Sequence, residues 1–451
     1  MKKKVIYVYF VSLGCSKNFV DTEVMAASLI KNNIGITDDP KNASIYVINT
    51  CAFIAPARKE AEENIEDALN WKYSGKSRKI IVTGCLPQWD KNNTYFDKFN
   101  EVDLWLGIDQ ITLLADKIIE LVSSTILKEN AKVIKNELPD FIYDDMTPRL
   151  QLTPKCYSFI KIAEGCDNRC TYCSIPDIRG SLRSRSIASI CKEAENLLKN
   201  GVKELIVIAQ DITSFGKDQK KPNENLCMLL KELDNLPGNF WIRLHYLHPE
   251  GITDELIAQI KNSKHVIPYL DIPIQHISDK ILKLMNRKVM SDHIKNVLSK
   301  LKKEIPEIVI RTTFIVGFPS ETEKDFDELV KFVKEFKFER MGVFPYYPEE
   351  GTPAEKLLNQ IAPDIANKRA DIILNIHKEN SLNFNKQLVG KEYDVIIDSV
   401  TENGALGRTY MDSPDIDNTF NIKKCPVSKE CYFVKAKVTK ADFFNLHGVL
   451  R

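Results

Sequence analysis

The chain has 451 residues, of which 43% are hydrophobic and 28% are charged, and its formal net charge is +1 at pH 7. This length exceeds one ordinary core and predicts a soluble globular protein of two or three domains. The charge argues against a globally basic nucleic-acid binder, although a local basic patch stays open. No stretch approaches the roughly 20 apolar residues that cross a bilayer.

Short β-branched runs alternate with helix-patterned segments in the first third of the chain. Strands are expected at residues 5–11, 45–48 and 80–82. A helix is expected at 56–71, where a proline stands at a plausible first helical position and apolar residues recur four apart. This alternation favours a parallel α/β sheet, and we expect an amino-terminal domain at residues 1–135.

A polar, proline-bearing stretch at 136–154 interrupts the periodicity and indicates a linker. Six further strand patterns, each followed by helix-like sequence, occur at 159–163, 204–211, 240–247, 267–273, 308–317 and 340–347. They predict a partial (β/α)6 barrel at 152–381, with its chemistry at the carboxyl ends of the strands. Short strands separated by Gly and Asp/Asn turns predict a small all-β domain at 382–451, so the overall class is α/β with an all-β end.

Three cysteines each follow an apolar strand: Cys15, Cys51 and Cys85. The carboxyl ends of neighbouring parallel strands lie on one edge, so the three thiolates can converge and hold an iron-sulfur cluster with one iron left open. The alternatives are small buried core cysteines and, for Cys15 alone, a lipoprotein export signal. The export reading is weakened by two tyrosines in the short apolar run and by Ser12 at position minus three.

A second set, Cys166, Cys170 and Cys173, has the spacing C-x3-C-x2-C just after the expected strand at 159–163. Three thiolates within eight residues can hold a four-iron cluster and leave its fourth iron for an external ligand. Structural zinc is the alternative, but no nearby His or Cys completes a four-ligand site. We expect the other cysteines to be structural, with Cys425 and Cys431 a possible metal-binding pair.

The second set, with Tyr172 directly before its last cysteine and a six-unit β/α domain behind it, resembles the radical S-adenosylmethionine superfamily. Further segments resemble the methylthiotransferases over essentially the whole chain, and the last domain resembles a TRAM domain. These segments are SLGCSKNFVDTE, NTCAFI, VTGCLPQ, KIAEGCDNRCTYCSIP, RGSLRSR, AQDITSFG, LDIPIQH and TTFIVGFPSETE. Two positions depart from the family pattern: Ile212, where the family often has Thr, and the stretch NRKVM at 286–290, which has no Gly or Pro soon after Arg287. Both concern local loop shape.

The resemblance implies a transferase with two [4Fe-4S] clusters and S-adenosylmethionine as both methyl donor and radical source. Cys166, Cys170 and Cys173 would hold the radical-generating cluster, and Cys15, Cys51 and Cys85 an auxiliary cluster that handles sulfur. No side chain is expected to act as an acid or base, because the radical comes from the cofactor. An electron donor, a sulfur source and a cytoplasmic location are implied as well, with no membrane partner.

Two branches of the family differ in substrate. One modifies adenosine derivatives in transfer RNA, and the other modifies the β-carbon of an aspartate in protein twelve of the small ribosomal subunit. The stretch GRTYMDSPDIDNTF resembles the ribosomal branch, where an acidic segment is usual, and we expect it to be a docking element for the partner. A solvated turn is the alternative reading of DSPDID. A non-enzymatic RNA- or ribosome-binding module with structural clusters is the second class of function.

Contacts to S-adenosylmethionine are expected from the main chain around Tyr172, from Gln210 and Asp211 at a strand end, and from Arg311 on a later strand. Strand-end polar residues also serve as capping groups, so that reading stays open. The arginines of RGSLRSR are candidates to grip an acidic partner loop, or form a solvated basic loop.

Overall fold

The computed structural model describes residues 5–123, 132–219, 224–423 and 430–451. The chain forms two compact units. The amino-terminal unit comprises residues 1–152, 164–167 and 173–183, and the carboxyl-terminal unit comprises residues 153–163, 168–172 and 184–451. Two short segments around the second cysteine set therefore belong to the amino-terminal unit although they follow the expected linker.

The amino-terminal unit is built on a six-stranded sheet in which all neighbours are parallel, in the order β2-β1-β3-β4-β5-β6. The parallel α/β sheet predicted from the alternating pattern is confirmed. Its strands are β1 (Tyr7–Ser12), β2 (Gly35–Thr37), β3 (Ile45–Thr50), β4 (Lys79–Gly84), β5 (Leu104–Leu106) and β6 (Lys132–Ile134).

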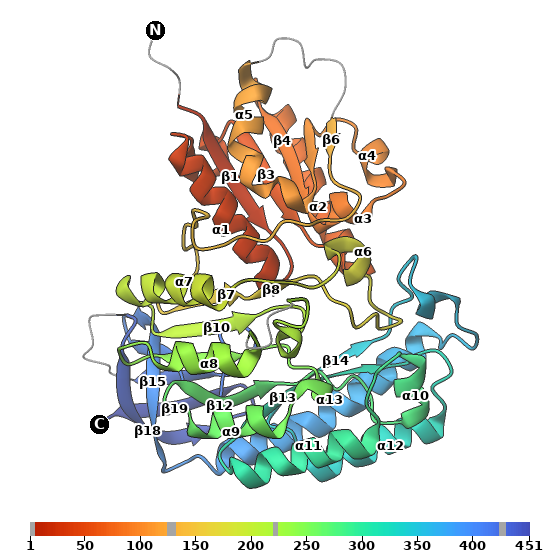
Figure 1. Ribbon diagram of the computed structural model, residues 1–451, viewed down its shortest axis with the longest axis vertical. Coiled ribbons are helices and arrows are strands. Elements are labelled where there is room, and N and C mark those ends of the chain that lie inside the picture. The colour runs from red at the N-terminus through yellow and green to blue at the C-terminus, as the bar shows by residue number, and fades with distance from the viewer. Residues whose placement is uncertain (1–4, 124–131, 220–223, 424–429) are drawn as a thin grey trace. The chain divides into compact units, whose positions relative to one another are not determined.

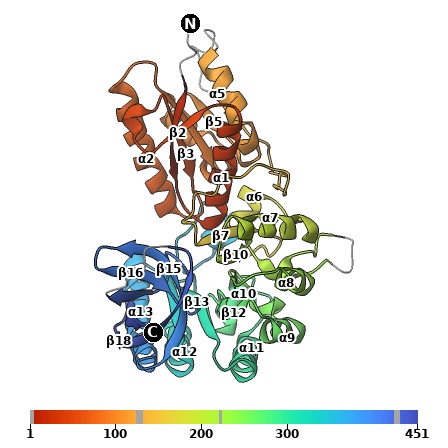
Figure 2. The same ribbon diagram turned by 90° about the vertical axis from the view of Figure 1, so that its left-hand side faces the viewer.

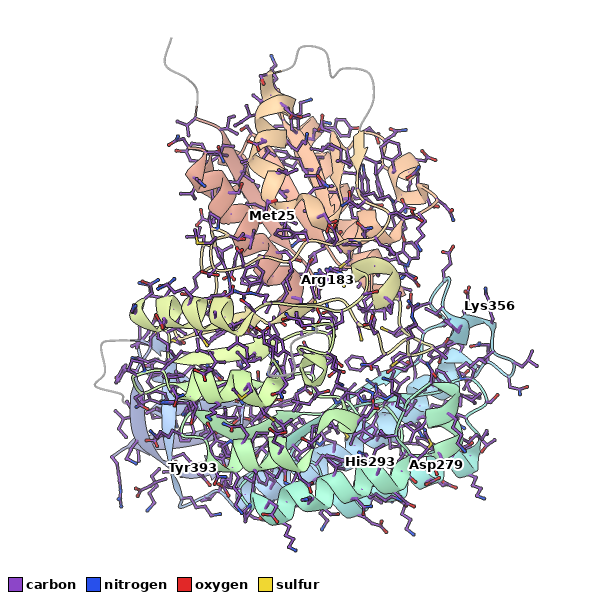
Figure 3. The ribbon with its side chains drawn as sticks, viewed as in Figure 1. Met25, Arg183, Asp279, His293, Lys356 and Tyr393 are labelled. Atoms are coloured by element: carbon purple, nitrogen blue, oxygen red, sulfur yellow. The ribbon has the colours of Figure 1, made fainter. Side chains whose placement is uncertain are left out.

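Helices cover both faces of this sheet. They are α1 (Ser16–Lys31), α2 (Ala55–Tyr73), α3 (Cys85–Trp89), α4 (Thr94–Lys98), α5 (Leu114–Ser123) and α6 (Ile175–Arg179). Figure 2 shows α2 on one side of the strands and α1 on the other. Met25 of α1, labelled in Figure 3, is fully buried, and Ala61 and Ile65 bury the apolar stripe of α2.

The carboxyl-terminal unit contains a second parallel sheet, in the order β14-β13-β12-β11-β10-β7. Figure 1 shows these strands with helices alongside them, as expected for six β/α repeats. The strands are β7 (Tyr157–Lys161), β10 (Glu204–Ile208), β11 (Trp241–Leu244), β12 (Val266–Asp271), β13 (Val309–Val316) and β14 (Arg340–Pro345). The helices are α7 (Ile187–Lys199), α8 (Leu226–Asp234), α9 (Asp254–Asn262), α10 (Asp279–Leu284), α11 (Ser291–Glu304), α12 (Glu323–Phe336) and α13 (Pro363–Lys386). Two further short strands, β8 (Ala163–Glu164) and β9 (Arg183–Ser184), form a two-stranded sheet.

The last strands close into a small barrel in the order β15-β16-β17-β19-β18. They are β15 (Glu392–Thr401), β16 (Gly404–Arg408), β17 (Thr419–Lys423), β18 (Phe433–Ala441) and β19 (Asn445–Leu450). The all-β character predicted for this region is confirmed. The boundary expected between 381 and 382 falls inside α13, which continues to Lys386.

The small barrel and the parallel sheet before it share one apolar core. Tyr269 of β12 and Val309 of β13 belong to the same buried cluster as Val395 of β15 and Phe420 of β17. Burial of these side chains holds residues 153–163 and 184–451 together as one unit rather than two.

Candidate functional site

The first three cysteines lie at the carboxyl ends of three adjacent strands. Cys15 precedes α1 after β1, Cys51 directly follows β3, and Cys85 directly follows β4. Because the sheet order is β1-β3-β4 and all three strands are parallel, the cysteines share one sheet edge. This is the edge where the sequence analysis expects them.

Two glycines allow the close approach of these segments. Gly14 has φ of +87°, and a Cβ atom added to it would lie 2.6 Å from Cβ and 3.0 Å from Sγ of Cys51. Gly84 has φ of +92°, and an added Cβ would lie 2.6 Å from the carbonyl oxygen of Thr50. Since the residues before Cys15 and Cys85 both pack against the Thr50-Cys51 segment, only glycine fits at these positions without strain.

The electrostatic environment differs among the three thiols. Burial, together with the neighbouring Cys85 and Cys15, raises the pKa of Cys51 to about 12. Burial also raises the pKa of Cys15, but Lys17, Arg179 and the backbone N–H groups of the first turn of α1 outweigh it and bring that pKa below its ordinary value. The thiols therefore interact with one another, and Cys15 loses its proton more easily than Cys51.

Arg179 is a buried cation at this edge. Its Nη2 lies 3.4 Å from Sγ of Cys85 and 3.2 Å from Oδ1 of Asn18, and its Nη1 lies 3.0 Å from Asp21 and 2.9 Å from Glu164. Only 1% of its side chain is exposed. A partner-gripping role for this arginine is therefore wrong, because carboxylates of its own unit already surround the guanidinium.

The other two arginines of RGSLRSR also bond to groups of this chain. Arg183, labelled in Figure 3, donates hydrogen bonds to the carbonyl oxygens of Ser181 and Arg179, and Arg185 is buried and paired with Glu193. The pattern of three arginines in seven residues is thus structural. Sequence could not reveal this, because the acceptors are backbone carbonyl groups and, for Arg185, the carboxylate of Glu193, and no pattern in the sequence marks these groups as partners.

The donor set fits a cluster of iron and sulfur. Three buried or half-buried thiols with no disulfide among them converge on one edge, and thiolates are the usual ligands of such clusters. Within the described residues, no three His, Cys, Asp or Glu side chains are grouped so that one metal ion would be held. A four-iron cluster is a body of several atoms, and its cysteines stand around it rather than around one ion.

The second cysteine set is divided between the two units, with Cys166 and Cys173 in the amino-terminal one and Cys170 in the carboxyl-terminal one. The backbone N–H of Cys166 donates to the carbonyl oxygen of Gly180 at 3.1 Å. Helix α6 begins two residues after Cys173 and packs on α3, where Ile178 joins the same core cluster as Cys85. The last cysteines of the two sets are therefore connected through two packed helices.

Cys170 lies in a loop that the helix α10 region holds in place. The backbone N–H and hydroxyl of Thr171 donate to the carbonyl oxygens of Met285 and Leu284 at 3.1 Å and 2.7 Å. Nη1 of Arg287 lies 3.8 Å from Sγ of Cys170, and its Nη2 donates to the carbonyl oxygen of Pro273 at 2.9 Å. Tyr172 packs against an apolar cluster that includes Met285. Its aromatic ring thus anchors the loop, and its main chain is left as the candidate cofactor contact.

Asp211 fixes the same loop from the carboxyl end of β10. Its Oδ2 accepts from Nδ2 of Asn168 and the hydroxyl of Ser214, both at 2.8 Å, and its Oδ1 accepts from the backbone and hydroxyl of Thr213. Burial raises the pKa of Asp211, but these hydrogen bonds outweigh it and lower the pKa below its ordinary value. Asp211 thus makes the contacts of a capping and loop-positioning carboxylate, which is the alternative that the sequence left open. Gln210, half-buried, directly precedes it.

Arg311 is engaged by carboxylates. Its Nη1 lies 3.1 Å from Asp271, and its Nε lies 3.5 Å from Asp417 in the loop between β16 and β17. Burial lowers the pKa of Arg311, but Asp271 and the other anionic neighbours raise it well above the ordinary value. These contacts connect two parts of the carboxyl-terminal unit, and a contact of Arg311 with S-adenosylmethionine stays a prediction.

The acidic segment DSPDID points largely into the protein. Asp412 is paired with Arg340 at 2.6 Å, Asp417 accepts from the hydroxyl of Tyr269 at 2.6 Å, and the hydroxyl of Ser413 is 3.0 Å from Nε2 of His245. Our expectation that this segment docks a partner is wrong for these residues, because their side chains are buried against the parallel sheet. The solvated-turn reading applies only to Asp415 and Ile416, which are exposed.

Sequence reasoning missed three residues that support the cysteines: Arg179, Arg287 and Asn168. Asn168 stands inside the C-x3-C-x2-C motif, so its spacing alone offered a signal. Each of the two arginines is more than 90 residues away in sequence from the cysteine that it contacts, so only the fold brings the two together. The predicted pair Cys425 and Cys431 cannot be described as a pair, because Cys425 lies outside the described residues.

Three family descriptions match the chain: "Uncharacterized protein family UPF0004" at residues 7–107, "Radical SAM superfamily" at 160–333 and "TRAM domain" at 389–450. The ribosomal protein uS12 methylthiotransferase RimO of Carboxydothermus hydrogenoformans is 44% identical over 448 residues, which cover 98% of each chain. The RimO of Acetivibrio thermocellus is 42% identical over 457 residues, covering 99% of this chain and 98% of that one. This chain belongs to the uS12 methylthiotransferase family.

Solved structures extend the likeness of this uS12 methylthiotransferase family member at the level of fold. The radical S-adenosylmethionine methyltransferase TsrM from Kitasatospora setae has a TM-score of 0.56 at 14% identity, covering 92% of this chain and 80% of that one. The cobalamin-dependent radical enzyme OxsB has a TM-score of 0.53 at 14% identity, covering 82% and 56%. Membership makes the chain a transferase with a radical S-adenosylmethionine domain, which implies one [4Fe-4S] cluster and S-adenosylmethionine. Among the described residues, no helix is long and apolar enough to cross a membrane.

Proposed function

We propose that this protein methylthiolates an aspartate of ribosomal protein uS12 at the β-carbon, using two [4Fe-4S] clusters. The observation that carries the proposal is the sequence relation to the uS12 methylthiotransferases over nearly the whole chain, together with two complete three-cysteine sets. Methylthiolation of transfer RNA is the alternative, and no relative named above carries it. The enzyme class makes a purely structural role for the clusters the weakest reading.

Cys166, Cys170 and Cys173 would hold the radical-generating cluster, and Cys15, Cys51 and Cys85 the auxiliary one. The convergence of the first three at one sheet edge supports the auxiliary assignment. When bound, the clusters and S-adenosylmethionine supply a methyl group, sulfur and a carbon radical able to remove hydrogen from unactivated carbon. Ordinary side chains lack that chemistry.

The residues of this chain would position the reacting groups rather than react. Asp211, through Asn168, would keep the loop that bears Cys170 in one conformation, and Thr171 would tie the same loop to the end of α10. We propose that the main chain at Tyr172 and the side chain of Gln210 contact S-adenosylmethionine, because both flank this loop or the adjoining strand end.

We propose an electron donor and a sulfur source as further partners, and the cytoplasm, where ribosomes are made, as the place of action. The electron is required because reductive cleavage of the sulfonium consumes one. The sulfur source is required because each turnover adds one sulfur atom to the product. We also propose functional modules at residues 1–135, 152–381 and 382–451, and the matched family ranges support this division.

The test is anaerobic reconstitution followed by incubation with reductant, sulfide, S-adenosylmethionine and either purified uS12 or bulk transfer RNA. We expect mass spectrometry to detect one methylthio group in place of hydrogen on an aspartate of uS12. A methylthio group on adenosine in the RNA instead would contradict the proposed substrate. Modification of neither substrate by a protein that carries both clusters would contradict the proposed function.

Cysteine variants separate the two sets. Cys170→Ala should abolish both 5'-deoxyadenosine formation and methylthiolation, whereas Cys15→Ala should retain 5'-deoxyadenosine formation and lose methylthiolation. Cys191→Ala, on α7, is the matched control and should retain both activities. Equal effects of Cys15→Ala and Cys191→Ala would contradict the auxiliary assignment.

A further inference from the structure

The amino-terminal unit contains a buried charge cluster that no step above uses. Arg179 lies between two carboxylates, Asp21 and Glu164, and touches Sγ of Cys85 with Nη2 at 3.4 Å. The side chains of Arg179, Asp21 and Glu164 are each exposed by 2% or less. Removing a guanidinium from water this completely is costly unless anions surround it, so the site is built around this one cation.

The chain positions Arg179 through the second cysteine set. Arg179 ends α6, which begins two residues after Cys173, and Glu164 stands two residues before Cys166. Gly180 follows with φ of +74°, and an added Cβ would lie 2.8 Å from the carbonyl oxygen of Pro139. The glycine thus lets the chain turn away directly after the arginine. The ion pair between Glu164 and Arg179 therefore joins the two ends of the segment 164–179. The guanidinium of the same arginine also contacts Cys85 of the first cysteine set.

A cation that donates a hydrogen bond to a cysteine sulfur acts on the charge of a cluster held there. Reduction adds one negative charge to a cluster, and a nearby positive charge stabilises that added charge by Coulomb attraction. Net charge and hydrogen bonds to the sulfurs are among the factors that set the reduction potential. In a site excluded from water this interaction is weakly screened, and Glu164 and Asp21 act in the opposite direction.

We propose that Arg179 is a positioning residue that orients Cys85 and raises the reduction potential of the auxiliary cluster, with Glu164 as its counter-charge. The inference rests on the proposed assignment of that cluster to Cys15, Cys51 and Cys85. Because Arg179 and Glu164 flank the radical-cluster cysteines in sequence, the same pair also connects the backbone of one cysteine set to the sulfur of the other.

The test uses the full chain with Cys166, Cys170 and Cys173 all changed to Ala, so that only the auxiliary cluster can form. Its potential is measured by redox titration followed by electron paramagnetic resonance. Arg179→Gln should disfavour reduction at least about tenfold, equal to roughly 59 mV for one electron, and Arg179→Lys should stay within about threefold of the parent. Glu164→Gln should shift the potential in the opposite direction, and the double variant Arg179→Gln/Glu164→Gln should lie between the two single variants.

Arg149→Gln is the matched control, because Arg149 is also a buried arginine of this unit but pairs with Glu23 of α1. It should leave the potential unchanged. Equal potentials for the parent, Arg179→Gln and Glu164→Gln would overturn the inference, as would a shift of the same size in Arg149→Gln. If Arg179→Gln fails to fold, the reduction potentials of Glu164→Gln and Arg179→Lys test the inference instead. An unchanged reduction potential in Glu164→Gln would then overturn it.

The failure of the proposed function gives a different result. If the parent with native Arg179 binds no iron after anaerobic reconstitution, the auxiliary assignment fails before any arginine variant is made. If the parent binds a four-iron cluster whose potential ignores Arg179 and Glu164, the assignment stands and only the inference fails.

Discussion

Replacing Asp412 by alanine should loosen the small barrel from the parallel sheet of the carboxyl-terminal unit. Asp412 and Arg340 are both 3% exposed as side chains. Oδ1 of Asp412 accepts a hydrogen bond from Nε of Arg340 at 2.8 Å and forms an ion pair with its Nη2 at 2.6 Å. Asp412→Ala leaves the guanidinium buried without its counter-charge, which costs about 3–5 kcal/mol. That corresponds to an increase in the opening equilibrium of at least about a hundredfold.

Native-state hydrogen exchange read by mass spectrometry measures this opening in peptides from β15 and β18. Asp415→Asn is the control, since Asp415 is exposed and its carboxylate accepts one hydrogen bond at 2.7 Å from the hydroxyl of Tyr157 on β7. Weakening that bond should cost about 1 kcal/mol. Arg340→Met/Asp412→Leu should cost less than Asp412→Ala, because an apolar pair replaces both charges. The reasoning is refuted if Asp412→Ala and Asp415→Asn accelerate exchange equally.

Three further outcomes follow from single side chains. Arg287→Leu, which removes the guanidinium 3.8 Å from Sγ of Cys170, should slow 5'-deoxyadenosine formation at least about tenfold with the auxiliary iron retained, a loss of roughly 1.4 kcal/mol in the barrier; an unchanged rate would contradict it. Gly14→Ala should reduce the iron bound by the first cysteine set, because its Cβ would lie 2.6 Å from Cβ of Cys51, and iron analysis of the purified protein checks this. Burial lowers the pKa of His276 to about 3, so the unfolded chain takes up this proton below pH 6.5 while the folded chain does not, and stability is lost as the pH falls. Between pH 7.5 and 5.5, His276→Gln should lose roughly 1.4 kcal/mol less unfolding free energy than the unaltered protein, as urea titrations would measure.

The cysteine edge of the amino-terminal unit was predictable because strand direction alone determines it. Cys15, Cys51 and Cys85 each end a β-branched run, and parallel pairing then puts them on one edge without any knowledge of side-chain packing. The buried positive charge of Arg179 beside Cys85 was not predictable in this way. Arg179 reaches Cys85 across 94 positions of sequence, and only the packing of α6 on α3 creates that neighbourhood.

The acidic loop of the small barrel was misread for a related reason. A run of aspartates in a turn looks the same in sequence whether it faces solvent or a set of buried arginines. Its partners Arg340, Arg311 and Tyr269 stand on three strands that precede it by 70 to 150 positions, and nothing in the local sequence marks them as the groups that bind this loop. The negative charge of the loop therefore predicted an exposed surface, whereas the fold buries these aspartates between the small barrel and the parallel sheet.

The apolar core and the ion pairs between the small barrel and the parallel sheet limit how domains of such enzymes can be exchanged. Asp412 pairs with Arg340 of the sheet. Glu204 of β10 pairs both with Arg243 of the same sheet and with Arg408 of the barrel. A chimera that exchanges residues 389–451 between two relatives would import Arg408 and Asp412 without their partners Glu204 and Arg340. Such exchanges should succeed only when the charged side chains of the recipient sheet match opposite charges of the donor barrel, so inheritance of this module is tied to the sheet on which it packs.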